Sequence, residues 1–75
     1  MTVVFPEDWH PLVAHVQANV YSKPQQAIEA ARQLLKLCSS AEHIAYVYEK
    51  LGLAHLILGE HRLSCLYYEQ ARDLD

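Results

Sequence analysis

The sequence predicts an all-α domain of four helices arranged as two antiparallel hairpins. Large apolar residues recur at intervals of three or four in residues 9–20, 24–38, 41–58 and 61–74, which is the spacing of one face of an α-helix. Proline, serine and glycine residues separate these segments. In the last third of the chain, small residues recur at the spacing that two closely packed antiparallel helices require.

Two helices are predicted in the first half of the chain. In the first, residues 9–20, Asp8 is expected to cap the start, and Pro11 falls in the first turn, where its missing N–H is harmless. The second begins at Pro24, with Ser22 available as its cap. Its apolar stripe consists of Ala27, Ile28, Ala31, Leu34, Leu35 and Cys38.

The second half of the chain carries clearer start and stop signals. Ser39 and Glu42 have the spacing of a capping box and predict the start of the third helix. This helix is expected to run to about Leu58 and to end at Gly59. The fourth helix follows and continues to Leu74.

Seventy-five residues form one small domain, which we divide into an extended tail (1–8), a first helix pair (9–38) and a second pair (41–75). A domain of this size buries only about 60% of the surface that its unfolded chain exposes. Apolar residues nevertheless make up 52% of the chain. This excess favours a partner protein or self-association.

The charge pattern argues against nucleic acid and membranes as partners. The net charge is -3, and the six lysines and arginines form no basic run. No apolar stretch approaches the roughly 20 residues of a membrane span, and no signal-peptide pattern follows the first methionine. We therefore expect a cytoplasmic protein.

The cysteines and histidines do not form a recognisable catalytic or metal site. Cys38 and Cys65 lie on separate predicted helices and are expected to be buried free thiols. The five histidines show no metal-ligand spacing, and no nucleophile has a matching set of partners. We expect no catalytic residue, no metal and no cofactor, and hence no enzyme.

The second helix pair resembles one tetratricopeptide (TPR) repeat. In that family a Leu-Gly pair lies mid-way along the first helix, a Gly-acidic turn follows, and the second helix carries small and aromatic residues at fixed positions. The matching residues here are Leu51, Gly52, Gly59, Glu60, Ser64, Tyr68 and Ala71. His55 departs from the pattern, because the family usually has Tyr there.

The first helix pair matches the family less well. Ala14 and His15 stand where the family has Leu-Gly, and Pro11 stands where a large apolar residue packs. We interpret residues 9–38 as a degenerate repeat, with a plain helical hairpin as the alternative. The family's proline after the second helix would fall just beyond Asp75, so the chain is also expected to suit the amino-terminal part of a longer protein.

The resemblance implies a groove lined by the first helix of each pair. In the second pair its positions are Tyr46, Glu49, Leu53, Leu56 and Ile57. Trp9, Leu12, Val16 and Val20 continue it in the first pair. The alternative is that Leu53, Leu56 and Ile57 pack on the first helix pair. Relatives that hold acidic carboxyl-terminal peptides have Lys and Asn where Glu49 and Leu53 stand, so that chaperone-docking subclass is not favoured.

These observations lead to a protein–protein interaction module, adaptor or chaperone-like, that binds a peptide or helix of a partner through an apolar surface. The alternative is a self-assembling domain, a homodimer within a larger regulatory protein.

Overall fold

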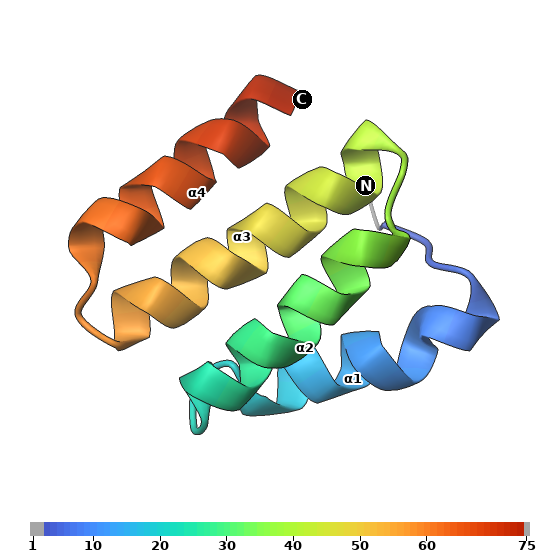
Figure 1. Ribbon diagram of the computed structural model, residues 1–75, viewed down its shortest axis with the longest axis horizontal. Coiled ribbons are helices and arrows are strands. Elements are labelled where there is room, and N and C mark those ends of the chain that lie inside the picture. The colour runs from blue at the N-terminus through green and yellow to red at the C-terminus, as the bar shows by residue number, and fades with distance from the viewer. Residues whose placement is uncertain (1–2, 75) are drawn as a thin grey trace.

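The computed structural model describes residues 3–74, and this part of the chain is all-α, as predicted (Figure 1). Its elements are the short 3-10 helix η1 (Glu7–Trp9), α1 (His10–Asn19), α2 (Pro24–Leu37), α3 (Ala41–Ile57) and α4 (His61–Leu74). Residues 1–2 of the expected tail and Asp75 of the second pair lie outside the described residues.

Each helix packs against the next one along the chain: α1 against α2, α2 against α3, and α3 against α4. Short connections reverse the direction at each step, so that the helices form antiparallel pairs (Figure 1). A side-chain hydrogen bond also joins α1 to α3, because Gln17 Nε2 donates to the Tyr46 hydroxyl over 2.8 Å. Helix α3 therefore has neighbours on several sides.

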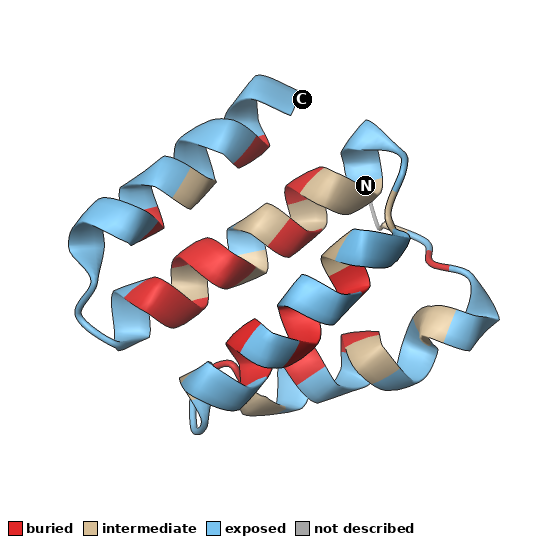
Figure 2. Ribbon diagram, in the orientation of Figure 1, coloured by how far each residue is buried: buried red, intermediate tan, exposed pale blue. Residues whose placement is uncertain are grey.

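The core lies between α1, α2 and α3, where the buried parts of the ribbon in Figure 2 gather. Its largest fully buried side chains are Val16, Leu34, Val47 and Leu51. Burying an aliphatic side chain of this size contributes about 1.5–3 kcal/mol to stability. Helix α4 contributes Ser64 and Ala71 as buried residues, so it forms an outer layer on α3.

The contact between α3 and α4 is close at Gly52. A Cβ atom there would lie 3.2 Å from the Ser64 carbonyl oxygen and 3.2 Å from two ring carbons of Tyr68. Gly59 ends α3 with a φ of 81°, in the left-handed region that favours glycine. The Glu60 N–H then donates to the His55 carbonyl over 2.8 Å, as in a Schellman motif. The predicted end of the third helix at Gly59 is confirmed, and Gly52 lies where α3 and α4 approach each other closely.

The predicted helix starts need correction. Ser40, not Ser39, caps α3 by accepting from the His43 N–H at 3.3 Å. Asp8 lies inside η1 and does not cap α1. The residue before α1 is Trp9 and the residue before α2 is Lys23, and neither makes a side-chain capping bond. A proline in the first turn of each of these two helices removes one N–H that would otherwise need a cap.

Candidate functional site

One side of α3 is only partly covered by its neighbours. We call this side the α3 outer face; it consists of His43, Tyr46, Glu49, Lys50, Leu53, Leu56 and Ile57. The α3 residues that meet the core, Val47, Leu51 and Ala54, are each 1% exposed. Steps of three and four residues place the outer-face residues on one broad stripe of the helix.

The carboxyl-terminal half of the α3 outer face is the open half. Leu56 is 42% exposed and Ile57 39% exposed, and Leu58 extends the aliphatic surface beyond the end of the helix. Leu53 is partly buried against the core. Glu49 is exposed and brings a negative charge to the edge of this surface.

The predicted continuation onto α1 is partly wrong. Val16 is 1% exposed and Val20 2%, because α1 turns both side chains into the core against α2. Trp9 and Leu12 are partly buried and pack on the edge of the same core. Of the four predicted residues on this side, the surface therefore retains parts of Trp9 and Leu12.

The amino-terminal half of the α3 outer face is covered by the chain itself. Phe5 lies 4.8 Å from the His43 ring and 4.9 Å from the Tyr46 ring, measured between centroids. Trp9 closes the cluster with its ring 5.1 Å from that of His43. Lys50 places its ammonium group 5.2 Å from the centre of the Tyr46 ring, where a cation–π interaction stabilises it. The predicted extended tail is thus a packed segment that ends in η1.

Sequence reasoning missed the roles of His10 and His43 in this cluster. Each imidazole hydrogen-bonds a backbone carbonyl of the tail, His43 to Val4 over 2.8 Å and His10 to Phe5 over 3.1 Å. These contacts join segments far apart in the chain, and backbone carbonyls leave no trace in a sequence. The apolar run ending in Phe5 was the one usable signal.

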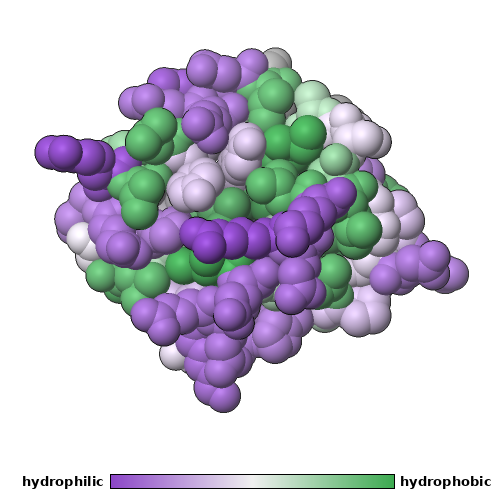
Figure 3. Space-filling view, viewed as in Figure 1, coloured by the Kyte–Doolittle hydropathy of each residue, from purple (hydrophilic) through white to green (hydrophobic). Residues whose placement is uncertain are grey.

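A second apolar surface lies on α4. Leu63, Leu66 and Leu74 are each more than a third exposed. Leu63 and Leu66 also line a shallow hollow between α2 and α4, together with Leu35 of α2 and Tyr48 of α3. Figure 3 shows hydrophobic residues in several patches on the face seen in Figure 1, with hydrophilic side chains crossing between them.

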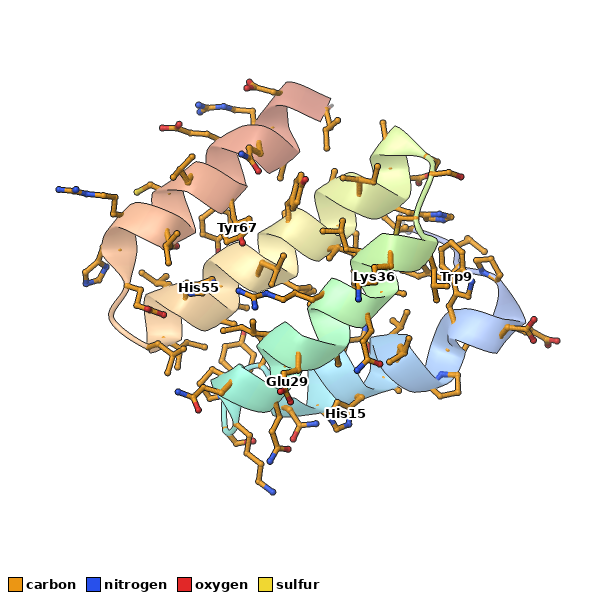
Figure 4. All side chains as sticks on the ribbon, in the orientation of Figure 1. Trp9, His15, Glu29, Lys36, His55 and Tyr67 are labelled. Atoms are coloured by element: carbon orange, nitrogen blue, oxygen red, sulfur yellow. The ribbon has the colours of Figure 1, made fainter. Side chains whose placement is uncertain are left out.

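His55 lies between α3 and α4, facing Tyr67 (Figure 4). Its ring stacks on Tyr67 at 5.4 Å with an interplanar angle of 10°, and its Nδ1 lies 2.8 Å from a Glu60 carboxylate oxygen. Its Nε2 is buried and has no hydrogen-bond partner among the described residues. His55 is therefore a packing residue between the two helices.

Burial raises the pKa of the Tyr68 hydroxyl, and the nearby negative charge of Glu49 raises it further. Burial also raises the pKa of the Cys38 thiol, whose Sγ donates to the Leu34 carbonyl over 3.2 Å. Cys65 is exposed, which corrects the prediction that both thiols are buried, because α4 packs mainly on α3 and Cys65 lies on its uncovered side.

Comparison of the chain with protein-family models, with curated proteins and with solved structures found no match. Within residues 3–74, no three His, Cys, Asp or Glu side chains come together in a group that could hold a metal ion. In the same part of the chain, none of the helices combines the length and the apolar character needed to cross a membrane.

Proposed function

We propose that this chain is a protein-interaction module, adaptor or chaperone-like, that binds a peptide or helix of another protein through the open half of the α3 outer face. The observation that carries the proposal is the exposure of Leu56 and Ile57 next to the partly exposed Leu53. Adjacent aliphatic side chains on one helix form the kind of apolar strip that an amphipathic helix or an extended peptide covers.

The packing of the second helix pair supports a TPR-like repeat as part of the proposal. Gly52 meets Ser64 and Tyr68 at close range, Ala71 is buried, and Gly59 reverses the chain. These are the positions on which the resemblance depends. We also propose a cytoplasmic setting, which the free thiols of Cys38 and Cys65 support, since thiols stay reduced there.

Self-assembly is the second candidate function, and the α4 surface favours it. Leu63, Leu66 and Leu74 are exposed on α4, whose main helical neighbour is α3. A two-fold symmetric contact is the commonest way in which a chain covers such a surface. The homodimer and the partner complex would thus use different helices.

The matched variants Leu56→Glu and Leu66→Glu separate the two functions. Both residues are exposed, so each variant is expected to keep its free energy of unfolding within about 0.5 kcal/mol of wild type. Leu56→Glu should abolish partner capture, because a carboxylate that is desolvated in an interface costs at least about 2 kcal/mol. Leu66→Glu should leave partner capture intact and abolish dimerisation, measured by sedimentation at micromolar concentration.

Partner capture is measured as the amount of partner protein that the wild-type and variant chains retain when each is used as bait. Titration with the purified partner then gives the affinity of each chain. If Leu56→Glu unfolds the chain, Leu56 is structural and the open half of the α3 outer face loses its proposed role. If Leu56→Glu binds the partner as tightly as wild type, the interaction lies elsewhere and the proposal is wrong.

A further inference from the structure

Residues 3–6, which we call the strap, lie across the amino-terminal half of the α3 outer face. In Figure 1 the strap leads away from η1 toward the turn between α2 and α3. Its one deeply buried side chain is Phe5, which is 9% exposed, whereas Val4 is 76% exposed. The strap is therefore held by one aromatic anchor.

The strap is held by side chains of two helices. His10 of α1 and His43 of α3 bind the Phe5 and Val4 carbonyls. Because a carbonyl oxygen can only accept, each imidazole donates through its Nε2–H, which is present in one neutral tautomer and in the imidazolium. Among the described residues, the one backbone–backbone bond of the strap joins the Pro6 carbonyl to the Trp9 N–H.

We propose that the strap is an intramolecular ligand: it occupies a peptide-binding site between α1 and α3, and a partner segment of the same chemistry must displace it. The site comprises His10, His43, Tyr46 and Trp9. The ligand that fits is an extended segment whose aromatic side chain enters the cluster while two successive carbonyls accept from the two imidazoles. The proposal rests on the proposed function, because it names the class of peptide that the α3 outer face binds.

The contacts of the strap support this ligand class. The aromatic cluster contacts a single side chain of the strap, and the two imidazoles hydrogen-bond backbone carbonyls, which every peptide has. The apolar hollow beside the strap is lined by Val13 and Ala14 of α1 and by Tyr46, and it leaves room for further side chains of a longer ligand. A bound segment can therefore extend beyond the footprint of the strap.

A segment held by one anchor and three hydrogen bonds opens locally without unfolding the helices. Burial of one Phe side chain favours the closed state by roughly tenfold to a hundredfold. A competing peptide then binds the intact chain more weakly by the same factor, since only the open fraction is competent. Weakening the anchor should raise the affinity for the added peptide.

The experiment measures binding of the blocked peptide Val-Val-Phe-Pro-Glu-Asp to wild-type, Phe5→Leu and Phe5→Ala versions of the 75-residue chain. Trp9, the single tryptophan, lies 6.2 Å from the Phe5 ring and reports the site by its fluorescence, and amide NMR shifts locate the bound peptide. We expect Phe5→Ala to bind the peptide at least roughly tenfold more tightly than wild type, with Phe5→Leu between them. Phe5→Leu also keeps the test available if Phe5→Ala does not fold.

Two controls accompany the titration. Val4→Ala changes an exposed side chain and keeps the carbonyl that His43 binds, so it should behave as wild type. A peptide with Ala in place of Phe should not bind any of the chains. Equal affinity of wild type and Phe5→Ala for the Phe peptide would overturn the proposal. Amide NMR chemical-shift changes confined to α4 on addition of the peptide would also overturn it.

The test also separates this inference from the proposed function. If no chain binds the peptide while Leu56→Glu still abolishes partner capture, the strap inference fails and the interaction function stands. If the peptide binds as expected while Leu56→Glu captures the partner normally, the proposed binding role of the open half of the α3 outer face is wrong, and the strap site stands.

Discussion

Gly52 offers a direct test of the α3–α4 packing, because replacing it by a larger residue forces a collision that the structure locates. The first added carbon meets the Ser64 carbonyl oxygen and two Tyr68 ring carbons, all at 3.2 Å. The Tyr68 ring can swing outward, since the side chain is 39% exposed. The Ser64 carbonyl belongs to the backbone of α4 and can move only with the helix.

The expected effect depends on the size of the new side chain. Gly52→Ala gains about 1 kcal/mol in helix propensity and loses a similar amount because the contacts are tight. Its free energy of unfolding is therefore expected to lie within about 1 kcal/mol of wild type. Gly52→Leu adds three more carbons to the same contact, and overpacking of this kind costs about 1–3 kcal/mol or more, beyond what the better propensity returns. In a domain of this size the melting temperature should fall by roughly 4–24 °C.

Thermal unfolding followed by circular dichroism measures the effect, with Glu49→Leu as the matched control. Glu49 lies one turn earlier on α3 and is exposed, so leucine there should change stability by no more than about 0.5 kcal/mol. At a solvent-exposed glycine both Ala and Leu would stabilise the helix. A Gly52→Leu chain that melts as high as wild type would therefore refute the close contact between α3 and α4.

Two further predictions concern local structure. Ser40→Ala should cost about 1 kcal/mol, because it removes the side-chain acceptor for the His43 N–H, while Ser39→Ala should have little effect; chemical denaturation compares the two, and equal losses would contradict the observed cap. A maleimide should label Cys65 faster than Cys38 at pH 7, as followed by mass spectrometry, because Cys38 is partly buried and its raised pKa leaves less thiolate. The Cys38 rate should keep rising as the pH increases above the ordinary thiol range, and faster labelling of Cys38 would refute this assignment.

The four helices could be predicted because each interval between helix breakers carries apolar residues at helical spacing. The stripe through Ala27, Ile28, Ala31 and Leu34 is an example, since all four side chains are buried where α2 meets its neighbours. The turn at Gly59 was equally readable, because a left-handed backbone conformation selects glycine. In both cases the signal and its physical cause lie within a few residues of each other.

The errors arose where the answer depends on distant residues. The sequence predicts a surface role for the α1 stripe, but α2 covers Val16 and Val20, because periodicity alone does not say which neighbour a stripe meets. The caps were misplaced by a residue or more, because Ser39 and Ser40 are adjacent and only backbone geometry decides which one faces the free N–H of His43. The packed strap depends on His10 and His43, which come from two different helices.

Helix α3 combines predictable and unpredictable contacts, and it is the helix on which the proposed partner site lies. One side of it meets the core at Leu51, a second meets α4 at Gly52 and His55, and the third is the outer face. A helix with apolar residues on three sides has no single polar face from which exposure could be predicted. Since the strap covers only the amino-terminal half of the outer face, Leu56 and Ile57 remain exposed beyond the strap. A partner segment that begins on these two residues and extends toward Tyr46 would have to displace Phe5, so that binding and strap release become one coupled equilibrium.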